Sequence, residues 1–392
     1  MSKKIRMKNG TAHIPRILFA AGGTGGHIYP ALAVQKALSG MNGRIECRFA
    51  CGARPLEYDL YIRSGVTPVV LNIPSRKTGF MGRFTDMFRL SLGFMQAFFF
   101  LLKWKPDWIL AQGGYVTAPV LAAARILRIP YDVQEQNAIP GKTNRWFAPG
   151  AHTIYCSFQD AASRFMRLDP DFRCLYTGMP LRPESLVRKE TDKILSRKSL
   201  GLEPELPLLL VLGGSQGAAN LYRHLSDALR EIDGKPSSCP DFQCLWSSGA
   251  QNFDWIQKEL ESRSLHRIRV RVQPYFDDMG RAFSAADAAV SRSGASSVAE
   301  LMANRIPTIF VPLPNSKDNH QWFNARVAVD AGAAIHIEED GNAGQSLVRG
   351  ITELMASGER RAQMSEFARG LMPQDAAETI ARDLLKKVKN SC

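Results

Sequence analysis

Two parts of the sequence repeat one arrangement, in which an apolar run ends in a glycine-rich loop and helical periodicity follows. Residues 16–21, Arg-Ile-Leu-Phe-Ala-Ala, lead into Gly-Gly-Thr-Gly-Gly at 22–26, and residues 206–212 lead into Gly-Gly-Ser-Gln-Gly at 213–217. Short apolar runs bounded by glycine and separated by helical segments are typical of parallel βα units. The repeat therefore predicts an α/β protein with two facing Rossmann-like, doubly wound domains.

Further apolar runs extend both halves into sheets. The additional strands that we expect are 44–50, 69–73, 107–111, 131–134 and 153–156 in the first half, and 242–246, 268–272, 288–291 and 308–311 in the second. The expected domains are a basic tail at 1–14, a first domain at 15–180, a linker at 181–205, a second domain at 206–370 and a C-terminal helical segment at 371–392. Packing of this last segment back on the first domain is one of two options, since the second domain could also receive it.

The composition is that of a globular chain. Of 392 residues, 45% are hydrophobic and 22% are charged, which excludes disorder as the main state. The seven cysteines are odd in number and form no CxxC pair, so we expect no disulfide framework, no metal and no cofactor. The most apolar window, 92–102, has eleven residues, whereas a membrane span needs about 20. We expect this window to be a buried crossover helix.

Positive charge is concentrated in the first part of the chain. Residues 1–150 contain 20 Lys/Arg and 7 Asp/Glu (+13), 151–200 contain 9 and 6 (+3), and 201–392 contain 21 and 24 (−3). This asymmetry favours a polyanionic partner, either nucleic acid, an anionic membrane or a phosphorylated substrate, although a solvated basic surface is equally compatible. Aromatic residues are not interleaved on a strand as in sheets that bind single-stranded nucleic acid, so we expect no nucleic-acid partner.

Glycine-rich turns between a strand and a helix can hold an anion, because backbone N–H groups approach it closely and the helix dipole is favourable. Such turns occur at 22–26, 213–217 and 293–295, and Gly113-Gly114 follows another strand. Competing phosphate motifs are incomplete, since Ile28 replaces the third glycine of a dinucleotide fingerprint and Gln136 replaces the first glycine of a P-loop. Anion-ready turns in two domains predict a ligand with a diphosphate, such as a nucleotide sugar.

Several segments, taken in order, resemble the motifs of a known family. They are Gly22-Gly23-Thr24-Gly25-Gly26-His27-x-x-Pro30, Gly113-Gly114-Tyr115, Glu135-Gln136-Asn137, Gly213-Gly214-Ser215-Gln216-Gly217-Ala218, Arg292-Ser293-Gly294-Ala295-x-x-x-x-Glu300 and His320-Gln321-x-x-Asn324-Ala325. This pattern is similar to the MurG family of UDP-GlcNAc:lipid I N-acetylglucosaminyltransferases, over about residues 15–340. The resemblance implies a GT-B fold with an interdomain cleft, and a metal-independent, inverting transfer of GlcNAc to the C4 hydroxyl of MurNAc in lipid I, forming lipid II for peptidoglycan.

The resemblance also implies roles for individual residues. Those expected to bind the UDP-GlcNAc donor are Thr24, Gly25, Gly26, Asn137, Arg182, Ser215, Gln216, Ala295, Ser296, Ser297, Glu300, His320 and Gln321. Those expected at the acceptor and its diphosphate are Gly22, Gly23, Gly113, Gly114 and Tyr115. Among these roles, Glu300 suits the ribose hydroxyls because a carboxylate accepts from two donors.

Two residues are candidates for the general base. His27 lies at the end of the first glycine loop, where the start of a helix favours a neutral imidazole over its cation. Glu135 is the alternative base, or else it orients its loop. Two positions depart from the family pattern, Gln134 where a histidine is usual and Met179 where an asparagine is usual.

Because lipid I has a polyprenyl anchor, the resemblance implies that the protein acts at the cytoplasmic face of the bacterial membrane as a peripheral protein. The predicted contact is Phe80, Arg83 and Phe84, because apolar side chains flanked by arginine suit an anionic interface. A complex of cell-wall synthesis enzymes is a further partner that the resemblance implies. The alternatives are a GT-B enzyme with another lipid or small-molecule acceptor, and an enzyme similar to UDP-GlcNAc 2-epimerase, which needs further acid and base carboxylates.

Overall fold

The computed structural model describes residues 13–41, 44–73, 80–187, 193–213, 218–235, 237, 239–262 and 265–391, with side chains for all of these except 80–90 and 391. Contacts between residues divide the chain into two compact units. The first comprises Met1–Pro180 together with Gln374–Cys392, and the second comprises Leu181–Pro373. The described parts of the predicted linker, 181–187 and 193–205, thus belong to the second unit.

The first unit is built on a seven-stranded sheet in which every pairing is parallel. Its order is β3 (Val69–Leu71), β2 (Glu46–Gly52), β1 (Arg16–Ala20), β4 (Trp108–Ala111), β5 (Tyr131–Glu135), β6 (Ile154–Cys156) and β7 (Cys174–Tyr176). The chain moves outward in opposite directions from β1 and β4. Ligands of open α/β sheets bind at the carboxyl ends of such a strand pair, and the loops at 22–24 and 112–113 both begin there.

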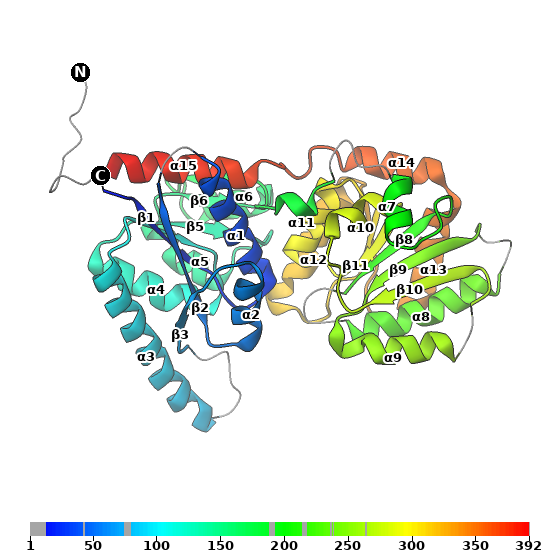
Figure 1. Cartoon of the computed structure of the whole chain (residues 1–392), viewed down its shortest axis with the longest axis horizontal. Helices are drawn as coiled ribbons and strands as arrows, with labels where there is room; N and C mark the ends of the chain where they lie inside the picture. The colour runs from blue at the N-terminus through cyan, green and yellow to red at the C-terminus, as the bar shows by residue number, and fades with distance from the viewer. Residues whose placement is uncertain are drawn as a thin grey trace, which may run out of the picture. The chain divides into compact units, whose positions relative to one another are not determined.

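Helices cover both faces of this sheet (Figure 1). They are α1 (Gly25–Ser39), α2 (Pro55–Arg63), α3 (Phe80–Trp104), α4 (Gly114–Leu127), α5 (Lys142–Phe147), α6 (Gln159–Leu168) and α15 (Ala376–Ser391), with a short 3-10 turn η1 (Ala148–Gly150). The two-residue period of β1 places Ile17 and Phe19 in one core with α1 and α15, and Leu18 and Ala20 in the opposite core with α3 and α4. Figure 1 shows α15, in red, alongside α1.

The second unit repeats the plan with six parallel strands. Their order is β10 (Ile268–Gln273), β9 (Phe242–Ser247), β8 (Leu208–Leu212), β11 (Ala288–Ser291), β12 (Thr308–Phe310) and β13 (Ala334–His336). The helices are α7 (Lys193–Ser199), α8 (Ala219–Asp233), α9 (Ala250–Glu261), α10 (Met279–Ala285), α11 (Ala295–Ala303), α12 (His320–Asp330), α13 (Ala343–Ala356) and α14 (Gly358–Phe367), with 3-10 turns η2 (Pro183–Ser185) and η3 (Lys317–Asn319). The predicted α/β class with two doubly wound parallel sheets is confirmed.

Helix α3 differs from the expectation for residues 92–102. The residues are helical, and Ala97 and Leu101 are buried, but Phe99 is 57% and Leu102 is 48% exposed. A helix that packs on one neighbouring layer buries one stripe and leaves the other stripe outside. The prediction of a buried helix is therefore wrong for the outer stripe.

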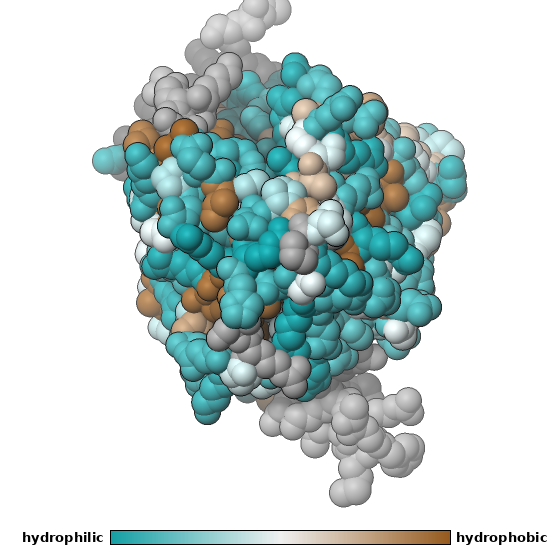
Figure 2. Space-filling view, turned by 90° about the vertical axis from the view of Figure 1, so that its right-hand side faces the viewer, coloured by the Kyte–Doolittle hydropathy of each residue, from teal (hydrophilic) through white to brown (hydrophobic). Residues whose placement is uncertain are grey.

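The face of the molecule shown in Figure 2 is mostly hydrophilic, and its apolar residues lie in small groups.

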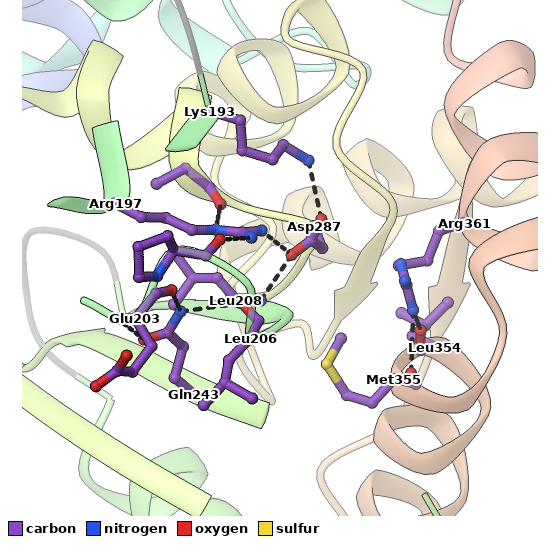
Figure 3. A network of polar contacts seen from close by, with 12 residues as sticks. Lys193, Arg197, Glu203, Leu206, Leu208, Gln243, Asp287, Leu354, Met355 and Arg361 are labelled. Carbon is purple, nitrogen blue, oxygen red and sulfur yellow. Dashed lines mark hydrogen bonds and ion pairs between the residues drawn. The ribbon is translucent and has the colours of Figure 1, made fainter. Parts of the chain in front are cut away.

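A polar network fastens α7 to the amino-terminal end of the second sheet (Figure 3). The buried guanidinium of Arg197 pairs with Asp287 and donates to the Ala285 and Pro204 carbonyls at 3.1 and 2.8 Å. Asp287 also accepts from Lys193 Nζ at 2.9 Å and from the Leu208 N–H at 2.7 Å. One carboxylate thus joins α7, the start of β8 and the loop before β11.

A second network holds α15 in the first unit. Lys387 Nζ lies 2.7 Å from the Asp132 carboxylate, 2.8 Å from Asp383 and 2.9 Å from the Tyr155 hydroxyl. Asp132 is fully buried and also accepts from Trp108 Nε1 at 2.9 Å. Burial raises the pKa of Asp132, and the attraction and hydrogen bond of Lys387 oppose that rise. The ammonium of Lys387 and the indole N–H of Trp108 therefore favour the ionised form of this buried carboxyl.

Replacing Lys387 by methionine should destabilise the first unit, because the buried carboxyl of Asp132 would lose its cationic partner and its hydrogen bond to the ammonium. Breaking a buried pair on one side costs about 3–5 kcal/mol. Lys386→Met, at an exposed neighbour on α15, should cost less than about 0.5 kcal/mol. The measurement is urea unfolding of the full chain, with hydrogen exchange of β4 and β5 to report on the first unit. Equal stabilities of the two variants would contradict this account.

Candidate functional site

The loops after β1 and β4 meet at the carboxyl edge of the first sheet. A Cβ atom on Gly114 would lie 2.9 Å from the Gly22 carbonyl oxygen and 3.4–3.6 Å from the His27 ring, and Gly114 has a φ of +79°. Only glycine leaves space for this approach without strain. The structure therefore brings together the first glycine loop, His27 and Gly113-Gly114. Their order in the sequence does not show that they are close.

Helices α1 and α4 begin at this edge, and no side chain caps their N-terminal amides. Thr24 is the N-cap of α1 and Gly113 is the N-cap of α4, and neither helix has a side-chain cap bond or an acidic residue in its first turn. Free amides and the helix dipole at such ends attract anions. Thr24, Gly25 and Gly26 therefore lie where a phosphate could be bound.

His27 lies in the first turn of α1 and reaches the neighbouring strand ends. Its Nδ1 atom is 3.1 Å from the side-chain oxygen of Gln136, which directly follows β5. The edge of the ring that carries Nε2 faces Gly114, where a Cβ would lie 3.6 Å from Nε2. A histidine that acts as a general base needs one ring nitrogen fixed by a partner and the other directed at the substrate. The contact of Nδ1 with Gln136 meets the first of these conditions.

Tyr115 has a partner that sequence reasoning missed. Its hydroxyl donates to Glu57 at 2.5 Å, and the other carboxylate oxygen of Glu57 accepts from the Gly52 N–H at 2.8 Å. Burial and the adjacent carboxylate raise the pKa of Tyr115. The guanidinium of Arg54 lies over the Tyr115 ring at 5.4 Å. Glu57 is buried on α2, and its pairing with Tyr115 of α4 could not be inferred from the sequence, because the two helices become neighbours only in the fold.

Glu135 ends β5 and organises the loop that follows it. Its carboxylate accepts from the N–H groups of Asn137 and Gly141, each at 2.9 Å, and from Asn144 Nδ2 at 2.7 Å. Burial raises the pKa of Glu135, and these donors oppose the rise. The carboxylate is thus surrounded by donors from its own loop, which is the geometry of a loop-orienting residue. Asn137 is held in the same cluster.

The second unit presents a comparable edge after β8 and β11. Gly213 follows β8, and a Cβ there would overlap the Tyr222 hydroxyl, which donates to the Ser247 carbonyl at 3.0 Å. Helix α11 begins at Ala295 with Gly294 as an N-cap that makes no side-chain bond. The Ser293 and Ser296 hydroxyls are buried and have no hydrogen-bond partner within the described residues. Ser215 and Gln216 lie outside the described residues.

Glu300 of α11 and Arg182, the residue before η2, interact with each other. Burial raises the pKa of the Glu300 carboxyl, and the charge of Arg182 and a hydrogen bond from Ser185 oppose the rise. Asn304, one turn further along, fixes the segment that carries Arg182: its amide donates to the Ser185 carbonyl at 2.8 Å and accepts from the Val187 N–H at 2.7 Å. Asn304 is a second residue that sequence reasoning missed.

Arg292 is a structural residue of the loop after β11. Its guanidinium donates to the Val311 and Pro312 carbonyls at 3.1 and 3.2 Å, and to Glu339 at 2.8 and 3.0 Å. It therefore ties the loop after β11 to the loop after β12. At the start of α12, Gln321 Oε1 accepts from the N–H of Leu313 in that loop at 2.9 Å, and His320 Nδ1 lies 2.7 Å from the Lys317 carbonyl oxygen.

The predicted membrane residues are only partly described. Helix α3 begins at Phe80 and includes Arg83 and Phe84, but their side chains lie outside the described residues. Within the described part of the chain, the helices are too short or too polar to cross a membrane.

Comparisons with known protein families and with individual relatives point to the same family. Residues 17–156 match the glycosyltransferase family 28 N-terminal domain, and residues 208–380 match the glycosyltransferase family 28 C-terminal domain. The UDP-N-acetylglucosamine--N-acetylmuramyl-(pentapeptide) pyrophosphoryl-undecaprenol N-acetylglucosamine transferase of Moorella thermoacetica is 32% identical over 379 residues, 96% of this chain and all of that protein.

Solved structures agree with this result. The crystal structure of Acinetobacter baumannii MurG is 26% identical, with a TM-score of 0.71, and the match covers 95% of this chain and 99% of that one. A putative UDP-N-acetylglucosamine 2-epimerase from Listeria monocytogenes has a TM-score of 0.68 at 14% identity over 96% of this chain and 98% of that one, so it shares the fold alone. The fold is GT-B. With both domain models matched, and with the Moorella enzyme aligned along its whole length, the chain belongs to the MurG family within glycosyltransferase family 28.

Proposed function

We propose that this chain transfers GlcNAc from UDP-GlcNAc to the C4 hydroxyl of MurNAc in lipid I, forming lipid II. The observation that carries the proposal is that each unit presents a helix N-terminus without a side-chain cap, α1 in the first and α11 in the second, at the carboxyl edge of its central strands. Both substrates contain a diphosphate, and such ends bind phosphate. The Moorella and Acinetobacter relatives support the same reaction.

In this proposal the donor binds the second unit. The Glu300 carboxylate accepts from the ribose hydroxyls, while Ala295, Ser296 and Ser297 hold the nucleotide at the start of α11. Ser215, Gln216, His320 and Gln321 complete the donor site, and Arg182 faces the diphosphate. As the bond from the anomeric carbon to the UDP oxygen breaks, negative charge grows on UDP. Preorganised N–H donors and a guanidinium stabilise this growing charge, so they stabilise the transition state more than the ground state.

The acceptor binds the first unit, with its diphosphate at Gly22, Gly23, Gly113 and Gly114 and its sugar near Tyr115. His27 accepts the proton of the C4 hydroxyl while the oxygen attacks the anomeric carbon from the face opposite UDP, which inverts the configuration. The donors around Glu135 favour an orienting role for that carboxylate, and it is the alternative base if His27 is not the base. The epimerase alternative has no observation of its own beyond the shared fold.

Replacing Glu300 by alanine should weaken UDP-GlcNAc binding by about 10- to 100-fold, because charged hydrogen bonds to the ribose are worth about 1.5–3 kcal/mol. Since burial raises the pKa of Glu300, acidification should also weaken binding at a higher pH than an ordinary glutamate would, and Glu300→Gln should remove that dependence. Isothermal titration calorimetry measures both effects. Glu261→Ala, at an exposed position on α9, is the control. Unchanged affinity in Glu300→Ala would rule out the assignment.

Replacing His27 by alanine should lower kcat by about 10²- to 10⁴-fold, the usual contribution of general-base catalysis. The Kd of UDP-GlcNAc should change little, because His27 is not among the residues expected to bind the donor and most of those residues belong to the second unit. The exposed His266→Ala serves as the control. The measurement is transfer of labelled GlcNAc to a lipid I analogue. Near-normal turnover in His27→Ala would move the role to Glu135 or to water.

We also propose that α3 contacts the anionic cytoplasmic face of the membrane. Leu92, Met95, Phe99 and Leu102 recur every three to four residues on its exposed stripe, and Lys103 and Lys105 flank it. An apolar stripe bordered by cations suits a lipid interface. The stripe continues the segment that contains Phe80, Arg83 and Phe84. A complex of cell-wall enzymes at this surface is part of the same proposal.

Changing Phe80, Arg83 and Phe84 to Ser, Glu and Ser should reduce binding to anionic vesicles by at least about tenfold, since each basic residue near the surface contributes about 1 kcal/mol and the phenylalanines add apolar burial. Phe99→Ser with Leu102→Ser should act in the same direction. Leu195→Ser, at an exposed apolar position of the second unit, is the control. Co-sedimentation with vesicles at rising salt measures the effect. Full sedimentation of both variants would exclude α3 as the contact.

A further inference from the structure

Three buried glutamines lie together at the carboxyl ends of β4 and β5. Gln112 follows β4, Gln134 lies within β5 and Gln136 follows β5, and each is 2% exposed or less. A buried amide is costly unless its donors and acceptors are satisfied. Glu135 between them already serves its own loop, so the glutamines form a separate network beside His27.

The hydrogen bonds of this network run in one direction. Gln136 Nε2 donates to Gln112 Oε1 at 3.0 Å and to Gln134 Oε1. Gln134 Nε2 donates to the Ser157 hydroxyl at 2.8 Å, and that hydroxyl donates to Met179 Sδ at 3.5 Å. With both N–H groups of Gln136 used, its Oε1 faces His27 Nδ1 at 3.1 Å.

The thioether of Met179 determines that direction. A thioether sulfur accepts hydrogen bonds and cannot donate them, so the Ser157 hydroxyl is the donor in its contact with Met179. The Ser157 oxygen then accepts from the Gln134 amide N–H, which turns Gln134 Oε1 toward Gln136. Gln136 in turn presents its oxygen to His27. An oxygen acceptor at Nδ1 requires the proton to reside on Nδ1.

We propose that Gln136 is a positioning residue that keeps His27 in the Nδ1–H tautomer, with Met179, Ser157 and Gln134 fixing the orientation of its amide. The proposal rests on the assignment of His27 as the base. The partner of one imidazole nitrogen decides which tautomer is present. The Nδ1–H tautomer puts the lone pair on Nε2, on the ring edge that faces Gly114, where the acceptor is proposed to bind. It also gives Gln134 and Met179, the two departures from the family pattern, one shared role.

Nitrogen-15 NMR of histidine in the full chain reads the tautomer directly, and a His27→Ala spectrum identifies the resonances of His27. In the unchanged protein, His27 should carry its proton on Nδ1. Gln136→Leu should move the proton to Nε2 and lower kcat by about 10- to 100-fold, as for other partners that orient a functional imidazole. The KM for UDP-GlcNAc should change by less than about twofold.

Two matched variants separate this role from general damage. Gln112→Leu removes an equally buried glutamine next to Gln136 but leaves Ser157 and Gln134 to orient it, so His27 should keep the Nδ1–H tautomer. Met179→Leu removes the acceptor sulfur at nearly constant volume and should give a mixture of tautomers. An Nδ1–H proton that persists in Gln136→Leu, or its loss in Gln112→Leu, would overturn the proposal. Normal turnover in His27→Ala would instead refute His27 as the base, and the NMR result would still stand.

Discussion

Parallel pairing of the central strands is the constraint on which both units depend. Because β1 is paired in parallel with β2 and β4, the chain leaves β1 and β4 at the same edge of the sheet and turns in opposite directions. The pair β8 and β11 has the same property. The loops that begin at Gly22, Gly113 and Gly213, and the starts of α1, α4 and α11, lie at such edges because the strands before them run in one direction.

Buried polar groups give these edges their shape. In the first unit, Glu57 and Glu135 hold neighbouring loops by accepting from backbone and side-chain donors. In the second unit, Arg292 does the same for the loop after β11: it donates to the Val311 and Pro312 carbonyls after β12 and pairs with Glu339 after β13. A carboxylate or guanidinium taken out of water is stable only with its full set of partners. The loops are therefore held in one arrangement, which a reaction that depends on placed donors requires.

The sequence predicted those features that depend on local pattern. Two domains, the glycine loops and the start of α1 beside His27 follow from apolar runs, glycine spacing and family motifs. It did not predict β7 (Cys174–Tyr176) or β13 (Ala334–His336), because these short edge strands are partly exposed and lack the longer apolar runs that marked the equally short β3, β6 and β12. It also missed Glu57 and Asn304. Glu57 is 58 residues from Tyr115 along the chain, and their contact exists only after α2 and α4 come together.

The placement of α15 has a consequence for the order in which the protein assembles. The core of the first unit includes Ile380, Leu384 and Val388, which follow all of the second unit in the chain. During synthesis the ribosome therefore makes most of the first unit, then the whole second unit, and only afterwards the helix that closes the first core. The second unit is continuous and can complete its fold earlier, although its synthesis begins later. Until α15 emerges, the apolar face of α1 lacks this cover, and such transiently exposed apolar surface makes a nascent chain prone to aggregate.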